Sequence, residues 1–358
     1  MISYDVTEFG QPLEQFERPT PTPAGTEVLL RTLAAGVCHS DLHLWEGGYD
    51  LGAAGKLNVE DRGIKRPFTM GHEVAGEVVA LGPAVDNAVA SGAREAAIGR
   101  RYLVYPWIGC GHCAVCASGE EQLCMQPRSI GIFRPGGYGD HVMVPHPRYL
   151  IPLGGLTPAE AAPYACSGVT TYGALRKLGP LIESQPIVLL GAGGLGLMCL
   201  TVLKAMGGRG AVVVDIDERK RQAALQAGAL AAVDGNAPDA ASQIAAAVGG
   251  PVLGVIDYVG GTSTVQLALG LLAKGGKLVI VGLFGGDVTL SLPPIPMRAL
   301  TIQGSYVGSL QELQELIALV ARSRAARIPI TPRPFAEASQ ALSDLHAGRA
   351  IGRYVLVP

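Results

Sequence analysis

Four cysteines crowd into fifteen residues of this chain and have the spacing of metal ligands. They are Cys110, Cys113, Cys116 and Cys124. Four thiolates satisfy tetrahedral Zn²⁺ and leave no open position, so the cluster predicts a structural zinc site in a lobe at about residues 106–126. The alternatives are free thiols or an iron–sulfur cluster, but the ferredoxin motif ends in Cys-Pro, whereas Met125 follows the last cysteine here. His112, inside the cluster, is expected to be exposed.

A second set of thiols and imidazoles is scattered over three segments. Cys38 opens the run Cys-His-Ser-Asp-Leu-His, His72 lies in Gly-His-Glu, and Cys166 opens Cys-Ser-Gly-Val-Thr-Thr-Tyr. Two thiolates and one imidazole with a free fourth position are typical of a catalytic zinc site. The three residues lie far apart in the sequence, so spacing alone leaves ordinary core packing open as the alternative.

A glycine-rich loop predicts a dinucleotide site. The loop contains Gly191, Gly193, Gly194, Leu195 and Gly196, which form a G-x-G-x-x-G motif. The motif follows an apolar strand at 187–190 and opens a helical run at 195–206, which is the context it requires. The backbone N–H groups at the helix start would face the pyrophosphate.

Asp215 ends the next expected strand, where a carboxylate accepts hydrogen bonds from ribose hydroxyls and repels a 2′-phosphate. NAD(H) is therefore favoured over NADP(H). Arg219 and Lys220 follow closely and could weaken that preference.

The elements that must position these residues fall into two patterns. Short apolar runs separated by Gly and Pro predict a β-rich domain at 1–165, completed by 308–358. Strands that alternate with helices predict a doubly wound parallel sheet at 166–307, which gives an α/β fold class. The final strand, at 354–356, is expected to return to the N-terminal domain.

Composition limits the function classes. A formal net charge of −2 argues against nucleic acid or an anionic membrane as the main partner. The N-terminus shows no signal-peptide pattern, and no apolar run reaches the roughly 18 residues of a membrane span, so a cytoplasmic protein is expected. Seven cysteines in a reducing compartment are thiols or metal ligands, and Cys199 is assigned to the core.

The combined motifs resemble those of the zinc-dependent alcohol dehydrogenases of the medium-chain dehydrogenase/reductase family, in particular its bacterial and yeast-like members. The family signature G-H-E-x2-G-x5-G-x2-V is matched by Gly71, His72, Glu73, Gly76, Gly82 and Val85. The resemblance runs from end to end. It implies a Rossmann domain that binds NAD and a GroES-like catalytic domain.

The resemblance also implies catalytic roles. Cys38, His72 and Cys166 would ligate the catalytic zinc, and Asp41 would orient His72 through its other ring nitrogen. Glu73 matches a carboxylate near the metal. Ser40 would accept the proton of the alcohol, and a relay would continue to His43, for which an ordinary surface position is the alternative.

Further residues would contact the cofactor. His39 and Arg353 would lie near the pyrophosphate, and Lys220 would contact the ribose. Thr170, Val281 and Ser305 align with positions that line the nicotinamide pocket. For Val281 and Ser305, packing at a strand end is the alternative.

The substrate pocket is where this chain departs from the family pattern. The stretch 47–66 makes Cys38 and His72 about ten residues further apart than in yeast-like members, and the family places this stretch near the substrate channel or a subunit edge. Trp45, Tyr105 and Trp107 are candidate pocket walls, with structural packing as the alternative for each.

The resulting hypothesis is an enzyme with two zinc ions per chain that reversibly oxidises primary or secondary alcohols with NAD. A polyol or sugar-alcohol dehydrogenase is the alternative within the family. A non-catalytic nucleotide-binding protein is the remote alternative, because such proteins usually lose the zinc ligands. A homotetramer or homodimer is expected, with an alcohol or aldehyde as the small-molecule partner.

Overall fold

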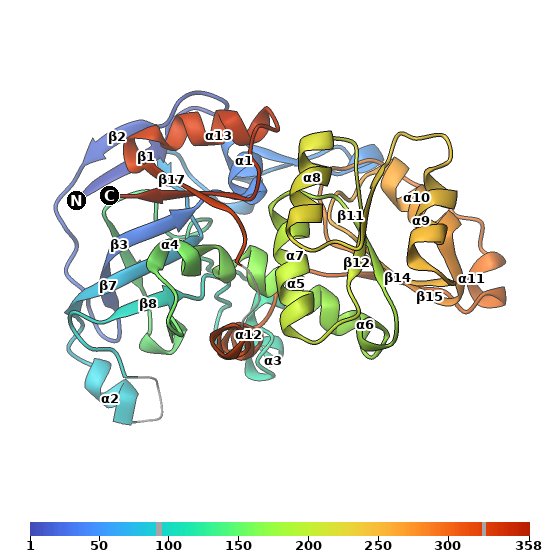
Figure 1. Cartoon of the computed structure of the whole chain (residues 1–358). Coiled ribbons are helices and arrows are strands. Elements are labelled where there is room, and N and C mark those ends of the chain that lie inside the picture. Colours follow the sequence, from blue (N-terminus) through green and yellow to red (C-terminus); the bar gives the residue numbers. More distant parts are fainter. Residues whose placement is uncertain (91–94, 324–326) are drawn as a thin grey trace.

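The computed structural model describes residues 1–90, 95–323 and 327–358. In Figure 1 the N-terminal strands and the C-terminal segments form one body, and the middle of the chain forms a second body beside it. Within the described ranges, no helix is long and apolar enough to cross a lipid bilayer.

The middle of the chain folds into a parallel sheet. Its strands are β11 (Ile187–Leu190), β12 (Ala211–Asp215), β13 (Ala231–Asp234), β14 (Val252–Asp257), β15 (Leu272–Ile280) and β16 (Thr301–Gly304). They lie in the order β13-β12-β11-β14-β15-β16, and every adjacent pair is parallel. This is the strand order of the dinucleotide-binding doubly wound fold, and it confirms the predicted fold class.

Helices cover both faces of this sheet. They are α5 (Ser167–Leu178), α6 (Leu181–Ser184), α7 (Gly194–Ala205), α8 (Glu218–Gln226), α9 (Ala240–Val248), α10 (Thr262–Leu271) and α11 (Pro294–Met297). Alternate residues of β11 enter different cores: Val188 and Leu190 pack with α9 and α10, whereas Ile187 and Leu189 pack with α5 and α7. Burial on both faces explains why β11 is apolar at every position.

The other body is built on a larger, mostly antiparallel sheet. Its strands are β3 (Val28–Gly36), β7 (Glu73–Leu81), β8 (Arg101–Val104), β9 (His141–Val144), β10 (Leu150–Pro152), β17 (Ile330–Pro334) and β18 (Arg353–Val357). The order is β10-β8-β7-β3-β18-β17, with β9 also paired to β3. Val355 of β18 lies opposite Gly36 of β3, so the last strand returns to the N-terminal body as the sequence predicted.

Smaller elements complete this body. A three-stranded sheet contains β1 (Ile2–Val6), β2 (Glu14–Glu17) and β6 (Phe68–Thr69), and a hairpin contains β4 (Gly48–Asp50) and β5 (Lys56–Asn58). The helices are α1 (His39–Trp45), α2 (Val85–Ala90), α3 (Ala114–Ala117), α4 (Pro158–Ala161), α12 (Leu310–Arg322) and α13 (Ala338–His346). Short 3₁₀ turns lie at Gly52–Ala54, Glu60–Arg62, Glu121–Leu123, Pro147–Tyr149, Ala162–Ala165 and Phe335–Glu337.

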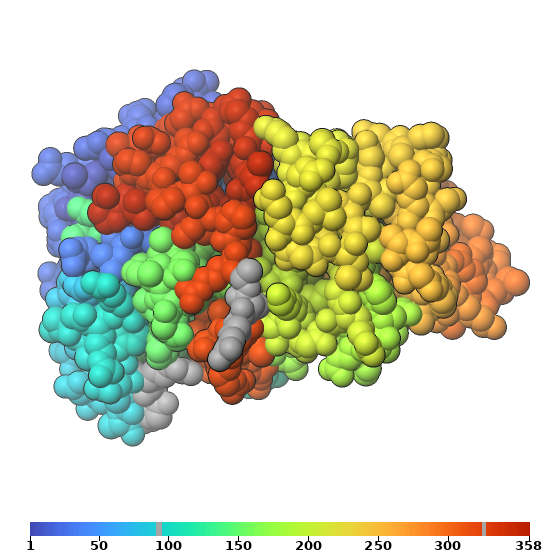
Figure 2. Space-filling view, in the orientation of Figure 1, coloured from blue at the N-terminus to red at the C-terminus, as the bar shows by residue number. Residues whose placement is uncertain are grey.

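The C-terminal residues join the two bodies. Figure 2 shows them (red) against the N-terminal residues (blue) on one side and against the middle of the chain (yellow) on the other. The start of β18 is buried at this junction, which brings Arg353 close to both bodies.

Candidate active site

The first two residues of the scattered ligand set are joined by strand pairing. Cys38 is the N-cap residue of α1, shortly after β3 ends, and His72 lies immediately before β7. Antiparallel pairing sets Gly36 opposite Glu73, which brings both ligands to the same end of the sheet. A Cβ atom at Gly36 would approach the Glu73 carboxylate to 1.9 Å, so the close contact requires glycine.

Cys166 completes this set from the residue before α5. Its sulfur lies 3.9 Å from that of Cys38, and the ligand atoms of Cys38, His72, Glu73 and Cys166 all lie within 4.8 Å of one another. A tetrahedral zinc ion with Zn–S bonds of about 2.3 Å holds two sulfurs about 3.8 Å apart. The contact between the two thiols lowers the pKa of Cys38 well below its usual value and raises the pKa of Cys166, so the pair favours one thiolate even without a metal ion. The donor set therefore fits zinc.

His72 provides the second test of fit. Its Nδ1 lies 3.1 Å from Oδ1 of Asp41, while its Nε2 is buried and has no hydrogen-bond partner among the described residues. Asp41 itself is fully buried and also accepts hydrogen bonds from the backbone N–H of Cys38 and from the hydroxyl of Tyr138. Burying an imidazole nitrogen without a partner is unfavourable. An unpartnered Nε2 beside two sulfurs is therefore the arrangement expected of a metal ligand.

Glu73 forms a buried ion pair with Arg353. The guanidinium contacts Oε1, while Oε2 is buried without a partner among the described residues. Burial raises the pKa of Glu73 to about 7, and Arg353 opposes that rise. Arg353 also lies against the glycine-rich loop, since a Cβ atom at Gly194 would meet its Cδ at 2.6 Å. This arginine thus touches both the ligand set and the dinucleotide loop.

The four-cysteine cluster forms a separate, closed set. Its sulfurs lie 3.5 to 3.9 Å apart in the pairs Cys113–Cys116, Cys113–Cys124 and Cys110–Cys116. Backbone N–H groups point at two of the sulfurs, as they do where a thiolate carries charge. His112 is exposed, and its Nδ1 forms a hydrogen bond with the carbonyl oxygen of Cys110. His112 therefore lies outside the ligand set, as expected. Four sulfurs leave no open position, so this set also fits zinc.

The glycine-rich loop connects β11 to α7 as the motif requires. A Cβ atom at Gly196 would lie 2.1 Å from the carbonyl oxygen of Gly191, so the close approach of helix to strand excludes any side chain there. Gly193 has open space around it. Open backbone at the N-terminus of a helix is what a pyrophosphate needs for close approach.

Asp215 lies at the end of β12 beside this loop. Its carboxylate accepts hydrogen bonds from the backbone N–H groups of Ala192 (2.7 Å) and Asp217 (2.9 Å). The guanidinium of Arg219 pairs with Asp217 at 2.7 Å. It therefore does not neutralise the carboxylate of Asp215. The arrangement favours ribose hydroxyls over a 2′-phosphate.

The remaining predicted cofactor residues lie on α1 (His39), on α5 (Thr170), after β15 (Val281) and after β16 (Ser305). Desolvation lowers the pKa of His39, and the nearby charges of Arg353 and Lys220 lower it further. The hydroxyls of Thr170 and Ser305 are buried, and neither has a hydrogen-bond partner within the described ranges. Val281 is half-buried just after β15, and its N–H bonds the carbonyl of Asp257.

The two predicted relay residues lie on α1. Ser40 is half-buried in its first turn. His43 is half-buried near the end of the helix, and its ring centroid lies 4.7 Å from that of Tyr49. Desolvation lowers the pKa of His43, which favours the neutral ring that a proton acceptor requires.

One of the three predicted pocket walls reaches the ligand set. The ring of Trp107 lies 5.3 Å from that of His72, and its indole N–H donates to the carbonyl of Ala165 at 2.9 Å. Tyr306, which the sequence analysis missed, meets Trp107 edge-on at 6.0 Å. Tyr306 follows β16 at the carboxyl edge of the parallel sheet, where ligands bind in such folds, and that position was the available signal.

The other two predicted walls, Trp45 and Tyr105, pack elsewhere. The indole N–H of Trp45 donates to the carbonyl of Gln11, and its ring contacts His346. Tyr105 is fully buried, and its hydroxyl donates to the carbonyl of Gly308. Both side chains make the packing contacts that were the alternative for each, and their role as pocket walls stays a prediction.

The stretch 47–66 is ordered around the hairpin of β4 and β5. Its tip meets the dinucleotide domain, because the backbone N–H of Ala53 donates to the carboxylate of Asp287 at 2.8 Å. Asp50 lies against Gly285 of the same loop. The stretch therefore bridges the two domains beside the ligand set.

Comparison with known proteins agrees with this geometry. The alcohol dehydrogenase GroES-like domain family matches residues 24–155, and the zinc-binding dehydrogenase family matches residues 194–322. An NAD-dependent alcohol dehydrogenase of Sulfurisphaera tokodaii is 38% identical over 100% of both chains. A D-arabinose 1-dehydrogenase (NADP(+)) of Saccharolobus solfataricus is 30% identical over 98% of this chain and 96% of that protein.

Solved structures give the same result. The alcohol dehydrogenase of Aeropyrum pernix has a TM-score of 0.87 and 28% identity, with full coverage of both chains. Together with the full-length sequence identity, this shows that the chain belongs to the zinc-dependent alcohol dehydrogenases of the medium-chain dehydrogenase/reductase family.

Proposed function

We propose that this protein reversibly oxidises primary or secondary alcohols to aldehydes or ketones with NAD as hydride acceptor. The observation that carries the proposal is the buried, unpartnered Nε2 of His72 beside the sulfurs of Cys38 and Cys166. This open ligand set adjoins a dinucleotide loop through Arg353, so substrate and cofactor would meet at one place.

When bound, the zinc ion lowers the pKa of an alcohol oxygen, and NAD accepts hydride. Cys38, His72 and Cys166 would hold the ion, and Asp41 keeps the proton on Nδ1 of His72 so that Nε2 is free to bind. Ser40 would accept the proton of the alcohol at its hydroxyl, and the neutral ring of His43 would pass it to solvent. Trp107 and Tyr306 would orient the carbon chain of the substrate.

Metal content and one variant test this proposal. We expect two zinc ions per chain, and we expect Cys38→Ala to abolish alcohol oxidation while NADH binding is largely kept. Fluorescence titration with NADH is the control for folding. One zinc ion or none in the active protein, or equal loss of activity and NADH binding, would contradict the assigned role.

The similarity to a D-arabinose 1-dehydrogenase favours a second candidate, oxidation of a sugar or sugar alcohol. Such dehydrogenases often replace the third cysteine ligand by a carboxylate, whereas Cys166 is present here. A panel of aliphatic, benzylic and sugar alcohols separates the two candidates, since a kcat/KM that is highest for sugars would favour the second.

Three further features stay as predictions. We infer that the catalytic domain comprises 1–165 and 308–358 and that the NAD-binding domain comprises 166–307. A homotetramer or homodimer in the cytoplasm is the expected form. Light scattering of the purified holoenzyme measures its assembly.

A further inference from the structure

The hairpin of β4 and β5 has its base fixed on the catalytic body. The backbone N–H of Val59 donates to the carbonyl of Gly47 at 3.1 Å, and Val59 and Ile64 are buried in the core. In Figure 1 this blue segment extends from the side of α1 toward the second body. Its tip, the 3₁₀ turn Gly52–Ala54, buries no residue of its own, so contacts with the second body decide where the tip lies.

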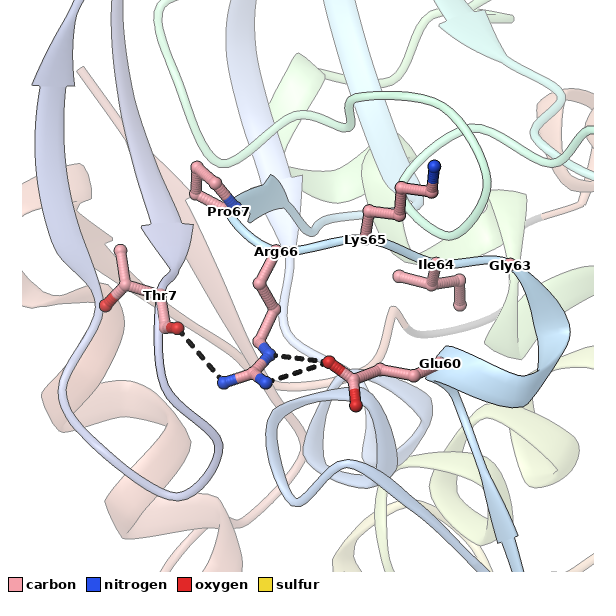
Figure 3. A pocket seen from close by; sticks show the side chains of 7 residues that line it. All are labelled: Thr7, Glu60, Gly63, Ile64, Lys65, Arg66 and Pro67. Carbon is pink, nitrogen blue, oxygen red and sulfur yellow. Dashed lines mark hydrogen bonds and ion pairs between the residues drawn. The ribbon is translucent and has the colours of Figure 1, made fainter.

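The turn that follows the hairpin secures the base by charge pairing. Arg66 pairs with Glu60 at 2.8 Å and donates to the carbonyl of Thr7, as Figure 3 shows. The guanidinium of Arg62 lies 5.2 Å from the ring centroid of Phe133. All these partners belong to the catalytic body, so the base of the hairpin moves with that body.

Two aspartates interlock the tip with a loop of the dinucleotide domain. The carboxylate of Asp287 accepts a hydrogen bond from the N–H of Ala53 at 2.8 Å, and a Cβ atom at Gly52 would meet that carboxylate at 2.5 Å. From the other side, a Cβ atom at Gly285 would meet Asp50 at 3.2 Å. Each domain thus places an aspartate over a glycine of the other, and we call these five residues the clasp.

The loop that receives the tip lies at the carboxyl edge of the parallel sheet, where dinucleotides bind in such folds. The N–H of Gly285 donates to the carbonyl of Gly260, in the segment that follows β14. Val259 of that segment lies against the glycine-rich loop, because a Cβ atom at Gly191 would meet its Cγ2 at 3.1 Å. One short segment therefore separates the clasp from the loop that is predicted to face the pyrophosphate.

We propose that the clasp is a gate, which must open before the dinucleotide can enter or leave its site between the two domains. The inference rests on the binding of NAD that is part of the proposed function. While it is closed, the clasp ties the catalytic body to the dinucleotide domain beside that site. Ala53 and Asp287 are both exposed, so their hydrogen bond can break and re-form without unfolding either domain.

Stopped-flow fluorescence of NADH with the zinc-loaded protein tests the gate, because it measures the rate constants of association and dissociation. Gly52→Ala places a methyl group where the carboxylate of Asp287 lies. It should raise both rate constants by about three- to tenfold, the size expected for the loss of one exposed hydrogen bond. The same opening admits and releases the dinucleotide, so Kd should change less than about twofold.

Asp287→Ala removes the acceptor and should also raise both rate constants. Asp287→Asn keeps an accepting carbonyl oxygen but loses the charge, so it should recover part of the slow exchange. If Asp287→Asn exchanges NADH as fast as Asp287→Ala, the lost charge explains the effect and the gate is refuted.

Gly55→Ala is the matched control for backbone strain. Gly52 and Gly55 lie on the same hairpin with positive φ values of 63° and 86°, so alanine is unfavourable at both. A Cβ atom at Gly55 meets no other atom within 4 Å, so Gly55→Ala should exchange NADH at the rates of the unsubstituted protein. Equal acceleration in Gly55→Ala would contradict the inference, since strain in the hairpin would then be the cause.

Two further results would overturn the gate alone. One is unchanged rate constants in Gly52→Ala and Asp287→Ala when both variants bind NADH. The other is a rise in the dissociation rate constant without a rise in the association rate constant, because the clasp would then stabilise the bound cofactor. Failure of the unsubstituted protein to bind NADH would instead refute the cofactor of the proposed function.

Discussion

Asp41→Asn should weaken zinc binding at the catalytic site without affecting the four-cysteine site. A carboxylate can only accept hydrogen bonds, so Asp41 holds the proton on Nδ1 of His72, 3.1 Å away, and leaves Nε2 as the ligand atom. The other carboxylate oxygen accepts from the N–H of Cys38 at 2.9 Å and the hydroxyl of Tyr138 at 3.2 Å.

An asparagine side chain has only one accepting atom. If its carbonyl faces His72, its NH₂ group opposes the N–H of Cys38. If its NH₂ group faces His72, the ring must carry its proton on Nε2, where it blocks ligation. Loss of such a supporting group typically costs 10- to 100-fold in metal affinity, which corresponds to about 1.4 to 2.7 kcal/mol.

Chelator titration of the holoenzyme measures this effect, with zinc release followed by a chromogenic dye. The unsubstituted protein should release two zinc ions per chain, and Asp41→Asn should shift the midpoint of one release step while the other serves as the internal reference. Tyr138→Phe is the control, because it removes a donor to Asp41 without changing the tautomer of His72. Unchanged affinity at both sites would refute the argument that Asp41 selects the ligating nitrogen.

Four other outcomes are expected. Cys116→Ser opens the closed set and should lower both the zinc content by one ion per chain and the midpoint of thermal unfolding; unchanged zinc content would contradict a four-thiolate site. Asp215→Gly removes the charge that repels a 2′-phosphate and should raise the ratio of kcat/KM for NADP to kcat/KM for NAD by at least tenfold. An unchanged ratio would mean that this carboxylate does not contact the ribose. Gly196→Ala brings a methyl group 2.1 Å from a carbonyl oxygen. It should lower the free energy of unfolding in urea by about 1 to 3 kcal/mol. An unchanged free energy of unfolding would show that the loop has room for a side chain. His43→Gln should slow alcohol oxidation about 100-fold at pH 7, because a glutamine amide cannot accept the proton. The rate should partly recover at high pH, where hydroxide accepts the proton in place of His43. A uniform loss of rate at all pH values would argue against a relay.

The dinucleotide domain was predictable because its signals are local. The glycine loop, the apolar strand before it and the carboxylate that ends the next strand lie within thirty residues, and β11, α7 and β12 begin and end within about one residue of the expected limits. The parallel order then follows from right-handed crossover connections. The catalytic body was less predictable, because β3 pairs with β7, β9 and β18 over long separations that no local pattern encodes.

The same distinction holds for the metal sites. The four cysteines of the lobe are close in sequence, so their spacing alone predicted a closed set. Cys38, His72 and Cys166 meet only because Gly36 lies opposite Glu73 and because α5 starts beside that strand end. Residue types could suggest these ligands, and the resemblance to a family selected them, but the contact itself depends on non-local pairing.

The substrate wall shows why residue type and proximity in sequence are weak guides to a pocket. Trp45 lies seven positions after Cys38 but on the face of α1 that packs against the N-terminal segment and α13. Tyr306 lies far from every ligand in sequence, yet the end of β16 brings it to Trp107.

Arg62 follows the same logic. The run Glu-Asp-Arg-Gly-Ile-Lys-Arg at 60–66 contains two acids and three bases, and its composition does not tell which base lacks a partner. Only the fold shows that Glu60 turns to Arg66 and that Asp61 turns to Asn58. Which charge of this turn stays without a carboxylate partner in the described part of the chain is therefore decided by the partners that the fold brings together.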